Sequence, residues 1–271
     1  MLCTLLGAGL APALARAAGT QVVIAPTRLV FEGGQRSGMV HLSNRGATPS
    51  SVRISVVNKR MLESGLIVDI DQPQPDERFV DRLIRYSPRR VMLPPGGSQT
   101  VRLLMRVPQS GLAPGEYRSH LVLSSVPMPA APVESDDEES IGVAALMIVE
   151  MSIPVIYRAG RLDASVRFSS TDVRLETPAG GLATLHLRLE REGERSVYGD
   201  VEVDYARPDG SVYQIAQMTG IAVYYPTPAR ALRIGLRPPD GLRLDSGELR
   251  VSFRERDRHD PAHAEIAIPL R

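Results

Sequence analysis

The residues best suited to metal or acid–base chemistry lie in two short segments. The run His259-Asp260-Pro261-Ala262-His263 carries metal-ligand side chains, but its proline prevents a helix that would align the two histidines. Asp69-Ile70-Asp71 lacks the glycine and the distal glutamate of a calcium loop. The sequence also contains no nucleophile elbow, no Cys–His pair and no phosphate-binding glycine loop. We therefore expect no catalytic residue, no metal site and no cofactor, and the sequence argues against an enzyme.

Arginine supplies the other chemistry that this sequence offers. Lys59 is the only lysine among 32 basic residues, and arginine binds a carboxylate through two parallel hydrogen bonds. A GC-rich genome produces the same bias, so composition alone does not select one arginine over another. The formal net charge of +1 gives none of the basic excess that is typical of nucleic-acid binding. We expect no nucleic-acid partner.

The elements that must position these arginines are β-strands. With 271 residues and 43% hydrophobic content, the chain is long enough for two domains, each with its own core. Apolar and polar residues alternate between turns such as Gly33-Gly34 and Pro94-Pro95-Gly96-Gly97, which predicts sandwiches rather than helices. The strands predicted by this pattern are 22–24, 27–31, 39–44, 51–57, 101–107 and 120–126, then 164–168, 183–189, 201–205, 212–218, 230–234, 249–253 and 264–268.

The N-terminus has the composition of a secretion signal. Leu2–Leu14 is small and apolar, and Ala15-Arg16-Ala17 fits a signal-peptidase site, although the usual basic start is missing. We expect a signal peptide over about residues 1–18. The single cysteine, Cys3, lies within it, so the exported protein would have no disulfide. No stretch is long enough to span a bilayer, and we expect no stable membrane insertion.

One predicted strand is apolar on both faces. From Val143 to Ile153 one face is wholly apolar, and the other is apolar over its first half. A sandwich strand needs only one apolar face, because its other face meets water. The second face is therefore covered either by the rest of this chain or by a partner that lacks a strand, which would bind by strand addition. We call the face expected to enter a partner the donor face: Val143, Ala145, Met147, Val149 and Met151.

The opposite face, with Leu146 and Ile148, is expected to stay with its own domain. The segment before this strand, 134–139, holds five acidic residues in six and is expected to be a solvated loop. A long edge strand is also an aggregation hazard, so the unloaded protein could cap the strand by self-association.

Several segments follow one another in a recognisable order: Ala25–Gly33, Tyr86–Arg90, Leu93–Gly96, Gln99–Leu103, Gly115–Leu121 and Ile153–Arg158. Together they resemble the periplasmic chaperones of the chaperone–usher pathway, and two of them, Ser-Pro-Arg and Gly-Glu-Tyr-Arg, are similar to its archaic branch. The resemblance implies two immunoglobulin-like sandwiches in an L or boomerang arrangement: a signal over 1–18, a chaperone domain over 19–158 and a second sandwich over 159–271. It implies that the protein resides in the periplasm, binds pilus or fimbrial subunits by donor-strand complementation and delivers them to an outer-membrane usher.

The same resemblance implies residue roles. Arg28 matches an arginine that grips the subunit's C-terminal carboxylate, but the usual second cation, a lysine, falls on Pro154. Either Arg28 acts alone, or another arginine takes part, the candidates being Arg89, Arg90, Arg118 and Arg158.

Arg102 matches an arginine that fixes the angle between the domains, with Glu116 as a candidate neighbour; the alternative is that Arg102 is an unpaired surface residue. The alternative function is that of a structural or adhesive surface protein that keeps the apolar strand within its own fold.

Overall fold

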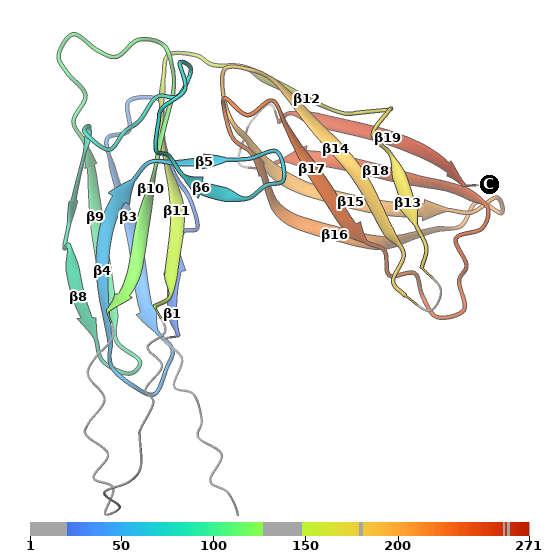
Figure 1. The fold of residues 1–271 in the computed structure, drawn as a ribbon, viewed down its shortest axis with the longest axis horizontal. Helices are drawn as coiled ribbons and strands as arrows, with labels where there is room; N and C mark the ends of the chain where they lie inside the picture. Colours follow the sequence, from blue (N-terminus) through green and yellow to red (C-terminus); the bar gives the residue numbers. More distant parts are fainter. Residues whose placement is uncertain (1–20, 127–147, 179–180, 257, 259–260, 271) are drawn as a thin grey trace, which may run out of the picture.

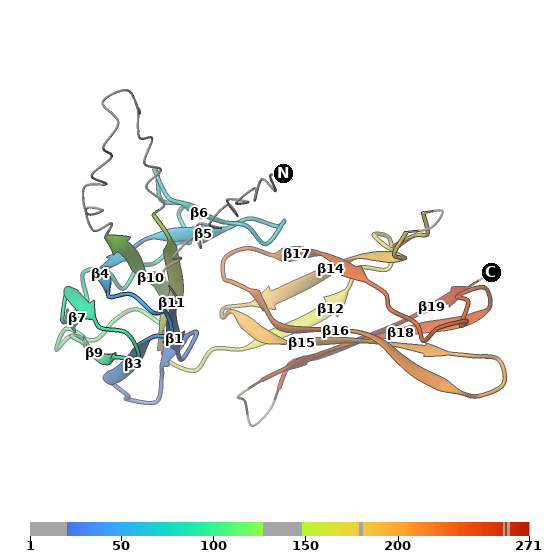
Figure 2. The ribbon, with the colours of Figure 1, turned by 90° about the horizontal axis from the view of Figure 1, so that it is seen from below.

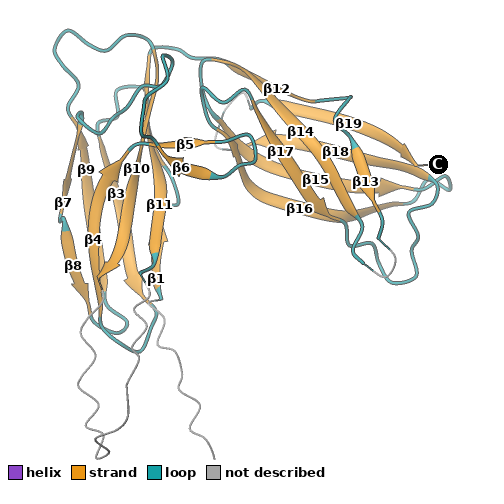
Figure 3. Ribbon diagram, in the orientation of Figure 1, coloured by secondary structure: helices purple, strands orange, loops and turns teal. Residues whose placement is uncertain are grey.

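A computed structural model describes residues 21–126, 148–178, 181–256, 258 and 261–270 of the chain. All regular elements in this described part are β-strands, as Figure 3 shows. They form two sandwiches whose long axes lie at an angle, giving the L shape seen in Figure 1. The all-β, two-sandwich fold expected from the sequence is thus confirmed. No helix able to cross a membrane occurs in the described segments.

The first sandwich has two sheets around a core of aliphatic residues and one phenylalanine, Phe31. One sheet has the order β1 (Val22–Ala25), β3 (Ser37–Asn44), β9 (Ser98–Met105) and β7 (Ile84–Ser87). The other has the order β2 (Leu29–Phe31), β11 (Glu150–Ala159), β10 (Gly115–Val126), β4 (Ser50–Val57) and β8 (Arg90–Leu93). The first strand therefore changes sheets, because β1 pairs with β3 whereas β2 pairs with β11.

The second sandwich has its own core, which includes Phe168, Tyr205 and Phe253. One sheet contains β12 (Ala164–Phe168), β14 (Thr184–Gly193), β13 (Arg174–Glu176) and β17 (Ala229–Gly235). The other has the order β16 (Val212–Val223), β15 (Val197–Ala206), β18 (Gly247–Glu255) and β19 (His263–Leu270). Of the metal-like run, His259 and Asp260 lie outside the described residues, and His263 is the first residue of β19. Among the described residues, no group of three or more metal-ligand side chains comes together.

A third element joins the two sandwiches. The hairpin of β5 (Lys59–Met61) and β6 (Ile67–Asp69) extends from the end of β4 toward the second sandwich (Figures 1 and 2). A small apolar cluster lies at the junction and draws on both sandwiches. Its buried members are Met61, Ile156, Ala222 and Tyr224, with Val30, Ile67 and Tyr198 packed against them.

Candidate binding site at the junction of the sandwiches

The edge of β11 is open over half its length. On one side β11 pairs with β10 from Glu150 to Ala159. On the other side β2 pairs only with Val155–Tyr157, so that among the described residues no strand covers Glu150–Pro154. Unpaired N–H and C=O groups along a strand edge can accept a strand from another chain.

The donor face is described only in part. Val143, Ala145 and Met147 lie outside the described residues. Val149 is half-buried and exchanges two hydrogen bonds with Ser125 at the end of β10. Met151 packs against the core of its own sandwich. Met151 was expected to enter a partner, but this side of the described strand, with Ile153 and Val155, fills the core of its own sandwich.

The opposite face departs from expectation. Ile148 was expected to stay with its own domain, but its side chain is 64% exposed. Glu150 and Ser152, on the same side of the strand, are also exposed. This side meets solvent because the second sandwich covers β11 only farther along, where Pro154 and Ile156 are buried.

Three polar residues follow one face of β10: Glu116, Arg118 and His120. Alternation along a strand puts every second residue on the same side, and a polar face of this kind normally meets water. All three are nevertheless at least 94% buried, with exposed fractions of 2%, 6% and 2%. They lie opposite Arg158, Ile156 and Pro154 of β11, so this face is covered by the junction with the second sandwich.

Arg118 is the unusual member of this row. Its Nε and Nη1 atoms are buried and have no hydrogen-bond partner, although buried polar groups are nearly always paired. Its guanidinium carbon lies 4.5 Å from the centre of the Tyr224 ring. Burial lowers the pKa of Arg118, against the opposing charges of Glu116 and Tyr224. A guanidinium buried without a hydrogen-bonded carboxylate costs stability, so its place here calls for an explanation.

Arg28 reaches the same junction from the segment between β1 and β2. Its guanidinium carbon lies 4.3 Å from the centre of the Tyr198 ring on β15. Burial raises the pKa of the Tyr224 hydroxyl, while the charges of Arg118 and Arg28 act in the opposite direction. The two arginines thus act on one tyrosine, and both stack on aromatic rings supplied by the second sandwich.

The remaining anchor candidates are placed elsewhere. Arg89 and Arg90 are exposed at the start of β8, at the edge of the first sandwich that lies away from the second (Figure 1). Arg89 stacks on Tyr86 at 5.1 Å. Arg158 lies at the junction, but its three nitrogens already donate to Glu116, Glu32 and the Ser196 carbonyl, each at 3.1 Å.

Glu116 pairs with Arg158 of the first sandwich, not with Arg102, and the network reaches the second sandwich through Ser196 and Arg258. Glu116 accepts from Nε of Arg158 and from both the backbone N–H and the hydroxyl of Ser196 in the second sandwich. Glu32 extends the network by accepting from Arg158 and Arg258. Burial raises the pKa of Glu32, but bonds and charge from these two arginines outweigh it and leave that pKa lowered.

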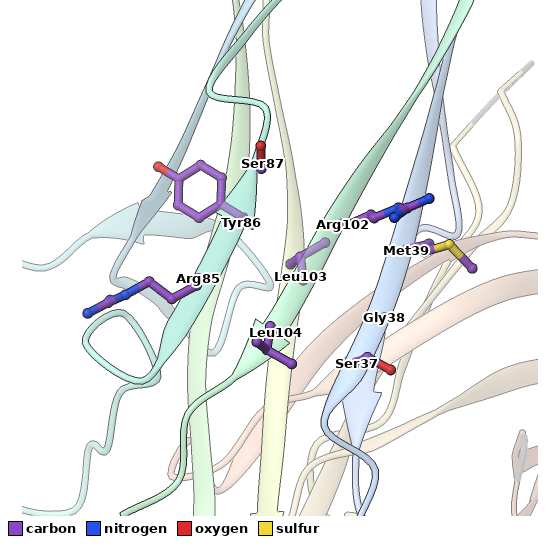
Figure 4. A pocket seen from close by; sticks show the side chains of 9 residues that line it. All are labelled: Ser37, Gly38, Met39, Arg85, Tyr86, Ser87, Arg102, Leu103 and Leu104. Atoms are coloured by element: carbon purple, nitrogen blue, oxygen red, sulfur yellow. The ribbon is translucent and has the colours of Figure 1, made fainter.

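Of the two alternatives for Arg102, the structure has the exposed surface arginine and does not bring Arg102 next to Glu116. Arg102 is exposed on β9, and no ion pair or side-chain hydrogen bond within the described residues includes it. It lines a surface hollow of 520 Å³ together with Met39, Leu104 and Arg85 (Figure 4). The mismatch arises because Arg102 and Glu116 lie on different sheets of the first sandwich.

His120 makes the junction sensitive to acid. Burial, followed by the charges of Arg118 and Lys59, lowers the pKa of His120 to about 3, against about 6.5 in the unfolded chain. Between these values the unfolded state binds a proton that the folded state does not. Stability should therefore fall as pH drops from about 6.5 toward 3, by up to about 1.4 kcal/mol per pH unit.

The substitution His120→Gln should remove this part of the acid sensitivity. Urea unfolding at pH values from 7 to 4 would show a smaller loss of unfolding free energy for this variant than for the wild type. His41→Gln is the matched control, because His41 is exposed on β3 and bonds only Thr100 in the described structure. An unchanged pH slope in His120→Gln would contradict the assignment.

Sequence reasoning did not identify Tyr198, Tyr224 or His120. A signal was present for the histidine, because Glu116 and Arg118 alternate with His120, the first residue of the predicted strand 120–126. Such a row predicts a solvated face, and only the second sandwich turns it into a buried one. The tyrosines carry no local signal, since they come from β15 and from the residue after β16.

Comparisons with known proteins lead to chaperones, although no protein-family model matches the chain. The curated Chaperone protein FimB/FhaD of Bordetella pertussis is 24% identical over 182 residues, which cover 67% of this chain and 68% of the relative. The CupB2 chaperone of Pseudomonas aeruginosa has a TM-score of 0.46 at 14% identity, covering 92% of this chain and 100% of its own. The CsuC–CsuE chaperone–subunit complex from archaic chaperone–usher Csu pili of Acinetobacter baumannii gives a TM-score of 0.46 at 14% identity, with coverage of 90% and 97%. These relatives are of the class that the sequence motifs indicated.

Proposed function

We propose that the protein is a periplasmic chaperone that binds pilus or fimbrial subunits by strand addition at β11 and delivers them to an outer-membrane usher. The subunit would pair with the open edge over Glu150–Pro154, and its C-terminal carboxylate would enter the junction between the sandwiches. Arg28 and Arg118 would hold that carboxylate. The protein would act by binding and release, without a cofactor.

One observation carries this proposal: the buried guanidinium of Arg118 has two nitrogens without a protein partner. His120 and Arg118 lie on β10 directly opposite Pro154 and Ile156. Arg118 can therefore supply the cation that Pro154 cannot. Because the open part of β11 ends at Pro154, a strand added there would bring its terminus toward this guanidinium. An ordinary structural sandwich protein has no use for an unpaired buried charge, since it only costs stability.

The decisive experiment is co-expression with a pilus subunit encoded beside this chain. A stable one-to-one complex in the periplasmic fraction is the expected result. Val149→Asp should lower the yield of co-purified subunit at least about tenfold, because a carboxylate on the donor face cannot enter an apolar partner. The free variant should stay folded, since Val149 precedes β11 and is only half-buried.

Ile148→Asp is the comparison variant, because Ile148 is the neighbouring residue on the exposed side. It should reduce the yield less than Val149→Asp. If both variants and the wild type co-purify the same amount of subunit, the subunit does not bind at the donor face. If the subunit remains soluble and folded without this protein, the chaperone proposal itself is wrong.

A further inference from the structure

The β5–β6 hairpin makes contacts that the fold of the first sandwich does not need. Its two strands pair only with each other. Its base is held by ion pairs from Lys59 to Asp69 at 2.6 Å and from Arg60 to Glu77 at 2.6 Å. Its tip reaches the second sandwich. The hairpin is therefore stiff at the base and is attached at the far end to the other sandwich.

Two hydrogen bonds attach the hairpin to one short segment of the second sandwich, Tyr224–Ala231. The hydroxyl of Thr227 donates to the carbonyl of Met61 at 2.8 Å. The backbone N–H of Ala231 donates to the carbonyl of Glu63 at 2.7 Å. Both acceptors are main-chain atoms of the hairpin, so the hairpin and this segment are fixed relative to each other.

A side-chain pair strengthens the attachment. The carboxylate of Glu63 accepts two hydrogen bonds from Arg188 on β14, at 2.6 and 2.8 Å. The bond from Arg188 lowers the pKa of Glu63, outweighing partial burial. Gly65 sits close against Arg230, such that a Cβ there would come within 2.6 Å of the Arg230 Nε. The hairpin tip is thus fitted closely to the second sandwich.

The clamped segment begins with the residue that supports Arg118. Met61 and Tyr224 share the apolar cluster at the junction, and the Tyr224 ring lies 4.5 Å from the Arg118 guanidinium carbon. Arg118 has no hydrogen bonds at Nε and Nη1 that would fix its direction. Its orientation therefore depends on the Tyr224 ring, and the position of that ring depends on the hairpin.

We infer that the β5–β6 hairpin is a positioning element, which holds Tyr224 so that Arg118 is aimed to receive a carboxylate. The inference rests on the proposed function, because it concerns the same carboxylate site. Met61, Glu63 and Thr227 are its positioning residues, and none of them needs to touch the bound subunit. A correctly aimed guanidinium forms two parallel bonds with a carboxylate, whereas a misaligned one loses much of that geometry.

The test measures discrimination between two ends of one probe. The probe is a short, labelled peptide of alternating valine and threonine, made with either a free C-terminal carboxylate or a C-terminal amide. Fluorescence anisotropy with the full chain should show that the wild type prefers the free acid by at least about tenfold. In Glu63→Gln/Thr227→Val this preference should drop to about threefold or less, with the affinity for the amide unchanged.

Two glycine variants provide an independent, matched comparison. Gly65 and Gly34 have similar positive φ values, +84° and +88°, but only Gly65 has neighbours within 4 Å of an added Cβ. In Gly65→Ala the added methyl must displace the Arg230 guanidinium, whose Nη1 donates to the carbonyl of Ala222 at 2.9 Å. This variant should therefore disturb the contact at the hairpin tip and reduce the preference for the acid, whereas Gly34→Ala should retain it. The charge-swapped pair Glu63→Arg/Arg188→Glu should also retain it.

The outcomes separate the two ideas. If the wild type binds the acid better and the hairpin variants keep the same preference, the positioning role is wrong. The positioning role is also wrong if the hairpin variants bind the free-acid peptide and the amide peptide more weakly by the same factor, because that result indicates a general structural loss. If the wild type binds neither peptide, or both equally, the carboxylate site fails, and the hairpin inference fails with it.

Discussion

Replacing Arg118 with methionine is expected to weaken subunit binding by about ten- to hundredfold while leaving the free chain as stable as the wild type or more stable. A charge-assisted bond to a carboxylate contributes about 1.5–3 kcal/mol, which corresponds to this loss. In the free chain the same guanidinium is buried with Nε and Nη1 unpaired. Replacing a buried charge by an apolar side chain of similar volume is often neutral or stabilising.

A variant that merely damages the fold would lower both subunit affinity and stability, whereas Arg118→Met should lower the affinity and leave the stability of the free chain unchanged or higher. Isothermal titration with a purified subunit peptide and thermal unfolding of the free variant measure the two effects. Arg90→Met is the matched control, since Arg90 is exposed at the far edge of the first sandwich; it should alter neither quantity. A folded Arg118→Met variant with wild-type affinity would remove Arg118 from the site.

Of the substitutions proposed here, Arg158→Met should lower the free energy of unfolding the most, by about 3–5 kcal/mol. Glu116, only 2% exposed, would lose the cation opposite it and keep only its two bonds from Ser196. Breaking a buried pair by removing one partner leaves an uncompensated charge, which accounts for the size of this effect. Urea unfolding followed by fluorescence and by hydrogen exchange would measure it.

The double variant Glu116→Gln/Arg158→Met should recover part of the loss, because it removes both charges. Arg250→Met is the control for deleting an arginine from an exposed pair: Arg250 and Glu248 bond at 2.6 Å on β18, and such pairs contribute about 0–1 kcal/mol. If Arg158→Met and Arg250→Met cost the same, the junction network does not stabilise the fold.

Long strands were predictable from sequence, whereas five of the seven strands of three or four residues were not. The pattern at 164–168 matches β12 residue for residue, and those for β4, β15 and β18 fall within the observed bounds. The hairpin strands β5 and β6, and also β7, β8 and β13, have three or four residues each. A period of two cannot be recognised over so few positions.

The site was predictable only as a set of alternatives. Arg118 was one of four candidates for the second cation, and nothing in its local sequence separates it from Arg89 or Arg90. What separates them is burial by the second sandwich, which depends on contacts between residues more than a hundred positions apart, such as Arg118 and Tyr224. Glu116 pairs with Arg158 and not with Arg102, because Arg102 lies on the other sheet of the first sandwich.

The change of sheets by the first strand decides what kind of protein this sandwich can be. While the chain pairs with β3 over Val22–Ala25 it leaves half of β11 uncovered, and on its way to pair at Leu29 it carries Arg28 to the junction. If the chain switched sheets at an earlier residue, its first strand would pair with the whole of β11. The edge over Glu150–Pro154 would then be covered, and no strand of another protein could pair there. The residue at which the chain switches sheets thus sets the length of the unpaired edge of β11 and also places Arg28 near its end. Grafting this crossover onto a closed sandwich would be the most economical way to give that sandwich an opening for a foreign strand.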